Sequence, residues 1–221
     1  HDTNNIARLQ YYTMNLYREL EQETGQSVGF HQTGYLYLAQ TEDRAHQLRI
    51  SAAKARQFSG VEFHEISLEE AAQRHPFVNL DGIRMAVWES ESGHVDVNGV
   101  THAYAQAARN RGVSIERFCP VLETNPRPDG GWDVVTEKGT IQTRVLVNAA
   151  GLWGREVARL AGLELPLMPL EHQYFVTEEI PEVAALDFEL PAVADRDGEY
   201  YLRQEGKGLS LIHISEPTRP S

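Results

Sequence analysis

A run of small residues after an apolar segment has the composition of a turn that holds a ligand against the backbone. The apolar run Val145-Leu-Val147 leads directly into Asn148-Ala-Ala-Gly151. Such a run is typical of a buried strand in a parallel sheet. Small residues leave the backbone open to close approach, and open α/β sheets bind ligands at the carboxyl ends of their strands. Residues 155–161, before Gly162, are predicted to form a helix whose first turn faces the same ligand.

Several clusters along the chain, taken with this stretch, carry a family resemblance. They are Leu20-Glu-Gln-Glu-Thr-Gly25, Gly29-Phe-His-Gln-Thr-Gly34, Gly93-His-Val-Asp96, Asn148-Ala-Ala-Gly-Leu-Trp153, Pro169-Leu-Glu-His-Gln-Tyr174 and Asp197-Gly-Glu-Tyr-Tyr-Leu-Arg203. In this order they resemble the D-amino-acid-oxidase superfamily of FAD enzymes, and within it the dimethylglycine and sarcosine dehydrogenases. The resemblance covers nearly the whole chain up to Gly208.

The resemblance implies FAD as the cofactor and a small amino acid, an N-methylated glycine, as the substrate. Hydride would pass from an N-methyl carbon to the flavin, and the imine would then hydrolyse or give its one-carbon unit to tetrahydrofolate. The folate-binding module of such relatives would lie beyond this chain, and the electron acceptor stays open. Two alternatives are a non-catalytic regulator related to the regulatory subunit of pyruvate dehydrogenase phosphatase, and a glycine or D-amino-acid oxidase of the same fold.

Two residues are candidates for catalysis by this resemblance. His172 resembles the histidine beside the substrate amine, where a group that titrates near neutral pH is useful because the unprotonated amine is oxidised. Tyr200 matches the first tyrosine of a Tyr-Tyr pair, and its phenol can hydrogen-bond the substrate carboxylate or the histidine. Tyr201 is expected on the opposite face of the strand, as a packing residue. Arg203, on the same face as Tyr201, is expected to be an ion-pair partner.

The expected flavin contacts are Ala150, Gly151 and Trp153, with the backbone of Val121 as a further contact near the adenine. No His, Cys or carboxylate set has the spacing of metal ligands, so the sequence predicts no metal site.

Composition limits the other classes of partner. A net charge of −12 over 221 residues argues against nucleic acid or an anionic membrane as the main partner. No apolar run approaches a membrane span, and no signal-peptide pattern is present. The single cysteine, Cys119, fits a reducing compartment: the cytoplasm, or the mitochondrial matrix in a eukaryote.

The predicted fold class is α/β, with a Rossmann-like FAD-binding domain that includes a β-meander and a discontinuous substrate domain with a mixed or antiparallel sheet. Residues 1–27 and 96–163 are assigned to the first domain, and residues 28–95 and 164–208 to the second. Helices are predicted over residues 5–23, 41–59, 98–110 and 155–161, with another beginning near Ser67. Strands are predicted within residues 28–40 and over residues 82–89, 113–118, 132–136, 140–143 and 145–148, and Lys138-Gly139 is expected to form a hairpin turn.

The two ends depart from the family pattern. The glycine turn Gly-x-Gly-x-x-Gly, which holds the pyrophosphate of FAD, does not occur, so the chain is expected to be truncated at its front and to bind FAD poorly by itself. Residues 209–221 resemble a translated sequencing adapter and are expected to form a frayed strand or a loose tail. The alternative for this segment is a genuine strand, with Leu209 and Leu211 on one face.

Overall fold

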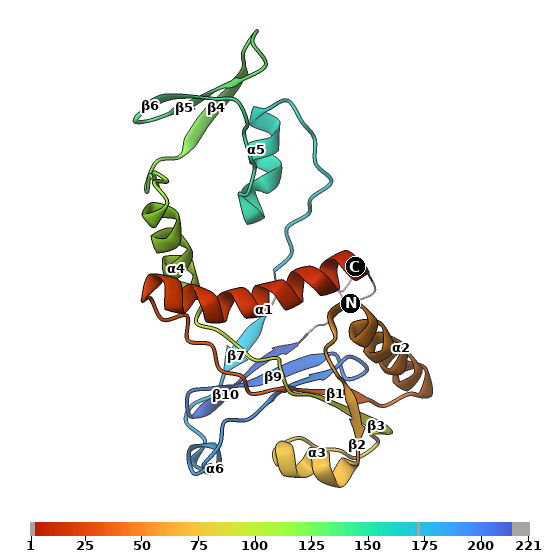
Figure 1. The fold of residues 1–221 in the computed structure, drawn as a ribbon. Coiled ribbons are helices and arrows are strands. Elements are labelled where there is room, and N and C mark those ends of the chain that lie inside the picture. The colour runs from red at the N-terminus through yellow and green to blue at the C-terminus, as the bar shows by residue number, and fades with distance from the viewer. Residues whose placement is uncertain (1–2, 172, 214–221) are drawn as a thin grey trace. The chain divides into compact units, whose positions relative to one another are not determined.

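The computed structural model describes residues 3–171 and 173–213, which divide into two compact units. The first unit combines the described parts of residues 1–112 and 172–221, and the second contains residues 113–171 (Figure 1). The helices are α1 (Asn4–Thr24), α2 (Glu42–Ser59), α3 (Leu68–Arg74), α4 (Val97–Asn110), the 3₁₀ helix η1 (Gly151–Trp153), α5 (Gly154–Leu160) and α6 (Pro181–Ala184). The strands are β1 (Tyr35–Ala39), β2 (His64–Ile66), β3 (Met85–Glu89), β4 (Val121–Pro126), β5 (Trp132–Thr136), β6 (Gly139–Thr143), β7 (Tyr174–Val176), β8 (Ala192–Asp195), β9 (Tyr200–Glu205) and β10 (Gly208–His213).

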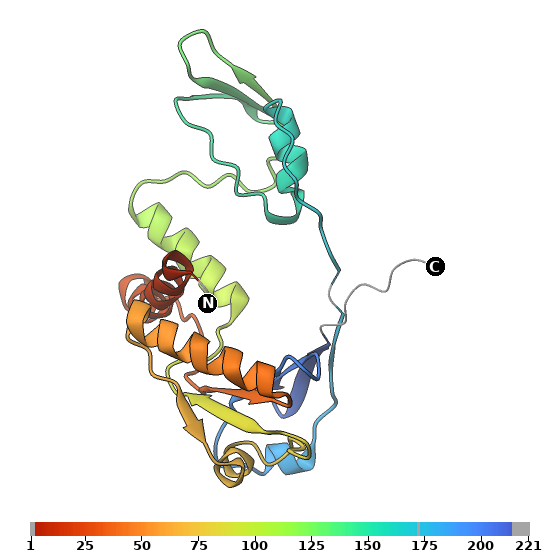
Figure 2. The ribbon, with the colours of Figure 1, turned by 90° about the vertical axis from the view of Figure 1, so that its right-hand side faces the viewer.

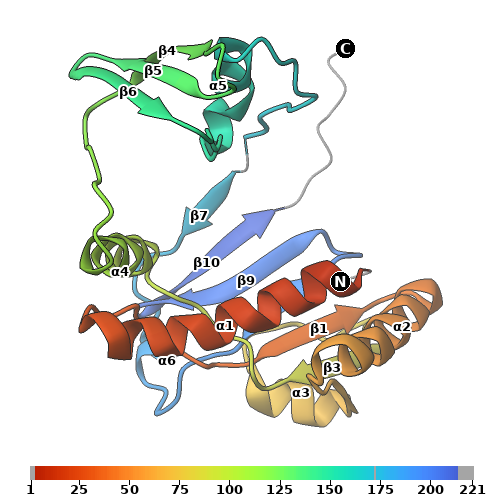
Figure 3. The same ribbon diagram turned by 45° about the horizontal axis from the view of Figure 1, so that its top comes forward.

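A seven-stranded mixed sheet organises the first unit, in the order β2-β3-β1-β8-β9-β10-β7. Figure 3 labels five of these strands: β3, β1, β9, β10 and β7. Strands β1 and β8 pair in parallel, and the other neighbours pair antiparallel. The second unit contains the antiparallel sheet β4-β5-β6. The predicted fold class, a mixed α/β chain with a β-meander and a separate mixed sheet, is therefore confirmed.

Strand β1 separates two hydrophobic cores because its side chains alternate between the faces of the sheet. Leu36 and Leu38 are fully buried in a core that includes Ala71 of α3. Ala39, on the other face, packs with Ala45 of α2. Helices α2 and α3 therefore cover opposite faces of the sheet, as Figure 2 shows.

Local capping explains where the longer helices begin and end. The side chains of Thr41, Ser67 and Asp96 accept hydrogen bonds from backbone N–H groups in the first turns of α2, α3 and α4. Gly25 ends α1 in the left-handed conformation, with φ of 70°, which glycine adopts without steric cost. These signals are local in sequence, so the predicted helices agree closely with those observed.

Two predicted strands of the second unit do not form. Residues 145–148 have no regular structure, and the side chains of Val145 and Val147 are 72% and 77% exposed. Residues 113–118 also form no strand, and Phe118 is 87% exposed with φ of 50°. An apolar pattern shows that a segment is suited to burial, but a strand also needs a neighbour to hydrogen-bond, and the described residues supply none for either segment.

Residues 209–213 belong to β10, a strand paired on both sides rather than a frayed strand or a loose tail. β10 lies between β9 and β7, and Leu209 and Leu211 pack against the core on the α3 face. The alternation of Leu209 and Leu211 was the correct signal, because a strand that pairs on both sides satisfies its backbone groups. Residues 214–221 lie outside the described residues.

The assignment of residues 1–27 and 96–163 to an FAD-binding domain remains a proposal. Helices α1 and α4 pack together through Leu20 and Ala103, and both belong to the compact unit that holds the seven-stranded sheet. The chain between α4 and β7 forms the second unit, in which α5 packs on β4.

The packing of β10 predicts a loss of stability in the variant Leu211→Ala. We expect the free energy of unfolding to fall by about 1–3 kcal/mol, because a partly buried leucine loses its contacts with the core. Thermal denaturation followed by circular dichroism measures the change. The exposed Lys207→Ala should stay within about 0.5 kcal/mol of the parent, and an equally small effect at Leu211 would favour the loose tail.

His75 predicts a pH-dependent stability. It is fully buried, neither ring nitrogen has a hydrogen-bond partner, and burial lowers its pKa from 6.5 to about 4. Below pH 6.5 the His75 side chain binds a proton in the unfolded chain, but in the folded chain it stays neutral until the pH falls to about 4. The contribution of His75 to the free energy of unfolding is therefore fully present above pH 6.5. It decreases as the pH falls, by about 3 kcal/mol at most.

Urea unfolding of the parent and of His75→Leu between pH 7.5 and pH 4.5 measures this contribution. The variant should lose stability less steeply than the parent, while the exposed His46→Leu should follow the parent. Parallel curves for the parent and His75→Leu would contradict the assignment.

Candidate functional site

The predicted flavin-contacting stretch forms a loop that one asparagine holds in place. The Asn148 side chain donates from Nδ2 to the carbonyl of Gly154 at 2.7 Å and accepts at Oδ1 from the Ala150 N–H at 3.2 Å. These two hydrogen bonds close the loop that contains η1, and α5 begins directly after it at Gly154. The stretch that the sequence placed after a buried strand is thus an ordered turn, although no strand precedes it.

This turn fits a group that lies against the protein backbone. Gly151 has φ of 53°, and an added Cβ atom there would meet no atom within 4 Å. Trp153 is 65% exposed and offers an uncovered indole ring. Ala150 is half-buried, so all three predicted contacts have solvent-accessible surface within the second unit. These are features that suit a flat cofactor such as a flavin.

Val121 lies elsewhere in the same unit, at the start of β4, and the strand predicted over residues 113–118 does not form before it. The register between β4 and β5 shifts between Val121 and Glu123, which marks a bulge or irregularity at this end of the strand. Val121 is 39% exposed.

Tyr200 begins β9 and lies on the α3 face of the sheet, where it packs against the same core as Leu202. It pairs in register with Asp195, whose carboxylate is almost completely buried. Burial and then the negative charge of Asp195 raise the pKa of Tyr200, so its hydroxyl stays protonated at neutral pH and can donate a hydrogen bond.

His172, the other predicted catalytic residue, lies outside the described residues. Tyr174 and Phe175, which follow it in β7, are 67% and 56% exposed.

An aromatic surface on the other face of the sheet was not found from the sequence. Tyr201 stacks on Tyr35 at 6.0 Å between ring centroids, and Tyr35 stacks on Tyr37 at 4.5 Å. Tyr37 in turn contacts Phe63 at 5.8 Å. Tyr201 therefore packs on the face opposite Tyr200, as the alternation of the strand predicts, and Arg203 pairs with Glu205 as an ion pair.

A cavity of about 630 Å³ opens beside this aromatic surface, with walls from α1, α2 and the sheet. Tyr37 lines it together with Glu89 and two arginines, Arg44 and Arg196. Burial raises the pKa of Tyr37 far above its usual range, and the charge of Glu89 adds to this effect. Arg44 forms an ion pair with Asp197 at 3.0 Å. Hydroxyl and guanidinium donors beside apolar walls suit a small molecule with a carboxylate, so this cavity, on the face of the sheet opposite Tyr200, is a second candidate location for such a ligand.

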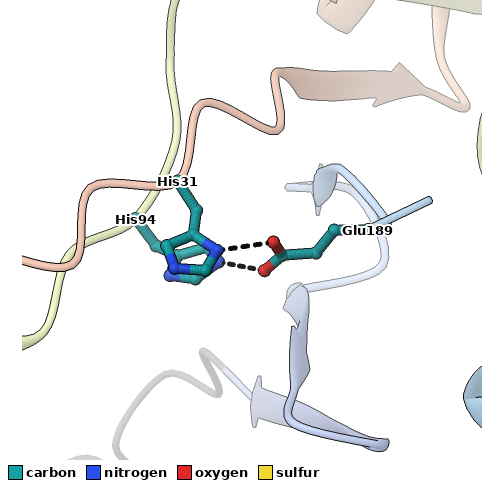
Figure 4. Close-up of side chains that lie close together, drawn as sticks. All are labelled: His31, His94 and Glu189. Atoms are coloured by element: carbon teal, nitrogen blue, oxygen red, sulfur yellow. Dashed lines mark hydrogen bonds and ion pairs between the residues drawn. The ribbon is translucent and has the colours of Figure 1, made fainter.

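A third group of side chains was also missed by the sequence: His31, His94 and Glu189 (Figure 4). His31 and Glu189 are 158 positions apart, and His94 and Glu189 are 95 apart. Ligand motifs are recognised by short spacings, so no pattern in the chain could reveal this set, and the predicted lack of a metal site was derived from spacing alone.

Comparison with known proteins assigns this chain to a family. A family model described as "FAD dependent oxidoreductase" (DAO) matches residues 1–218. The chain belongs to the DAO family of FAD-dependent oxidoreductases. Mitochondrial dimethylglycine dehydrogenase of Rattus norvegicus is 42% identical over 205 residues, which are 93% of this chain and 24% of that protein.

Other relatives of this DAO-family chain differ in what their names describe. Mitochondrial sarcosine dehydrogenase of Mus musculus is 34% identical over 88% of this chain and 21% of its own length. The mitochondrial pyruvate dehydrogenase phosphatase regulatory subunit of Mus musculus is 33% identical over 90% of this chain and 22% of its own length. The chain thus spans less than a quarter of the length of each of these three relatives.

Solved structures support the fold of this family member. The crystal structure of L-proline dehydrogenase from P. horikoshii matches with a TM-score of 0.81 and 25% identity, covering 97% of this chain and 56% of that one. Among the residues that the structure describes, no helix is both long and apolar enough to cross a membrane.

The hydrogen bonds of Asn148 predict that Asn148→Ala loosens the turn at residues 148–154. Loss of both bonds should cost about 1–2 kcal/mol of local stability, so the amides of residues 150–154 should exchange with solvent about tenfold faster. Hydrogen exchange followed by mass spectrometry measures this directly. Gln142→Ala, an exposed change on β6, serves as the control, and equal exchange in both variants would contradict the role of Asn148.

Proposed function

We propose that this chain is part of an FAD-dependent amine dehydrogenase or oxidase that removes a methyl group from dimethylglycine or sarcosine. The observation that carries the proposal is the 42% identity to dimethylglycine dehydrogenase over 93% of the chain. Because the relatives' names describe mitochondrial proteins, the proposal includes the mitochondrial matrix as the compartment.

The turn at residues 148–154 is proposed to hold the flavin. Ala150 and Gly151 would meet the cofactor through their backbone, Trp153 through its exposed ring, and Val121 through its amide near the adenine. When bound, the flavin supplies the acceptor for the two electrons taken from the amine. The part of this chain is to fix the turn, through Asn148, before the cofactor arrives.

His172 and Tyr200 are proposed to act on the substrate. A neutral imidazole at His172 would hold the substrate nitrogen without its proton, since only a nitrogen with a free lone pair can support loss of hydride from the neighbouring carbon. The protonated hydroxyl of Tyr200 would donate to the substrate carboxylate. Its raised pKa supports this role, because the hydroxyl keeps its proton across the working pH range.

Two other functions remain to be separated from this proposal. The 33% identity to a phosphatase regulatory subunit favours a non-catalytic regulator as the second candidate. A glycine or D-amino-acid oxidase of the same fold would oxidise the α-carbon instead of the N-methyl carbon. Reduction of the flavin by N-methylated glycines separates the regulator from both enzymes.

Anaerobic stopped-flow mixing of dimethylglycine or sarcosine with the flavin-loaded protein of which this chain is proposed to be part, rather than with this chain by itself, tests the proposal. The flavin absorbance should bleach, and His172→Gln should slow the bleaching by about 10²–10⁴-fold, the contribution of a positioned acid–base group. Tyr200→Phe should slow it more mildly, because only a hydroxyl is lost.

Tyr201→Phe is the matched control for Tyr200→Phe, since the two tyrosines are neighbours on opposite faces of β9. It should leave the reduction rate close to that of the parent. If Tyr201→Phe slowed reduction and Tyr200→Phe did not, the substrate would lie on the α2 face and the assignment of Tyr200 would be wrong. A flavin that stays oxidised with both amines would favour the regulator.

A further inference from the structure

We propose that His31, His94 and Glu189 form a binding site for a divalent transition-metal ion such as Zn²⁺. The three side chains come from three separate segments of the first unit: the segment before β1, the segment before α4 and the segment before β8 (Figure 4). The site is independent of the flavin-contacting turn and of Tyr200.

The backbone brings the two histidines together. His31 and His94 exchange a pair of backbone hydrogen bonds of 2.9 and 3.0 Å, which form an isolated antiparallel bridge. Gly93 permits this close approach, because a Cβ atom there would lie 1.9 Å from the carbonyl oxygen of His31. The two imidazole rings consequently stack, with 5.0 Å between their centroids.

Glu189 is held opposite the two rings by its neighbours in the chain. The N–H of Leu190 donates to the side chain of Gln204 at 2.8 Å, and Leu190 is almost completely buried. Residues before β8 therefore have a fixed backbone from which the Glu189 carboxylate reaches the histidines.

The donor atoms are those that zinc prefers. His31 Nδ1 lies 2.7 Å from Glu189 Oε2, and His94 Nε2 lies 2.6 Å from Oε1. One imidazole nitrogen from each histidine and one carboxylate oxygen of Glu189 all lie within 4.8 Å of one another. A tetrahedral Zn²⁺ with bonds of about 2.0–2.2 Å separates its donor atoms by about 3.3–3.6 Å. The ion would replace the two hydrogen bonds between the histidines and Glu189, and side-chain rotations alone would move the donor atoms to these distances. His31 has the freedom to turn, because its side chain is 54% exposed.

The surroundings favour a cation and leave it accessible. The three residues line an open cavity of about 760 Å³. Three more carboxylates line this cavity, from Asp96, Asp187 and Glu205, against the single guanidinium of Arg203. The excess of negative charge attracts a cation. Three protein ligands leave a fourth position of the ion open to the cavity, for water or another small ligand.

Isothermal titration of the full chain with ZnCl₂ tests the site, after removal of metals with a chelator and in a buffer that does not bind zinc. We expect one ion to bind in this site with a dissociation constant of about 10 µM or tighter. His31→Gln, His94→Gln and Glu189→Gln should each weaken binding by at least about tenfold. Zinc should also raise the Tm of the parent, because it binds only the folded site.

His102→Gln and His46→Gln are matched controls, since both histidines are exposed on helices outside this cluster. Both should bind zinc as the parent does. Circular dichroism of each variant checks that it is folded, and Glu189→Gln remains informative if a histidine variant unfolds, because it keeps the shape of the side chain. Co²⁺ in place of zinc should give the intense visible bands of a four-coordinate ion.

The proposal is overturned if no saturable binding occurs, or if the three substitutions leave affinity and stoichiometry unchanged. The second result would place the ion at another part of the chain. Loss of binding in the three variants, with the two controls unaffected, supports the site whether or not the protein oxidises amines.

Discussion

The parallel pairing of β1 with β8 is the constraint on which the first unit depends. It joins Tyr35 to Ala192 and Leu38 to Asp195, residues that lie more than 150 positions apart in the chain. With β1 fixed between β8 and β3, its alternating side chains define both cores: one that packs on α3 and one that packs on α2. The same pairing joins two separate stretches of chain into one compact unit and leaves residues 113–171 as a unit between them.

Features that depend on neighbours in sequence were predicted well. The helix starts at Thr41 and Ser67 follow from a few adjacent residues, and the structure reproduces them. The predicted hairpin also forms, but its turn lies one residue earlier: Glu137 and Lys138 form the turn, and Gly139 already pairs with Thr136. The two failed strands, at residues 113–118 and 145–148, had suitable apolar patterns but needed a partner strand that no local pattern specifies. Strand β10 is the opposite case: the alternation of Leu209 and Leu211 is visible in the sequence, and in the structure the strand pairs on both sides.

The same distinction applies to the site. The turn at Asn148–Trp153 is continuous in sequence and was recognised from its small residues, and the opposite orientations of Tyr200 and Tyr201 follow from strand alternation. The aromatic surface of Tyr35, Tyr37 and Tyr201 and the cluster of His31, His94 and Glu189 join segments that only the folded sheet brings together. Predicting them requires the pairing of β1, β8 and β9, which is a tertiary property.

Isotope effects on flavin reduction test the central claim, that the chain serves N-demethylation, most directly. The flavin-loaded protein that contains this chain is mixed anaerobically with dimethylglycine that carries deuterium either in the N-methyl groups or at the α-carbon. If hydride leaves an N-methyl carbon, only the N-methyl deuterium slows the reduction, and formaldehyde appears in proportion to the flavin reduced. A slower reaction with α-deuterium alone, or no reduction with either substrate, would contradict this account.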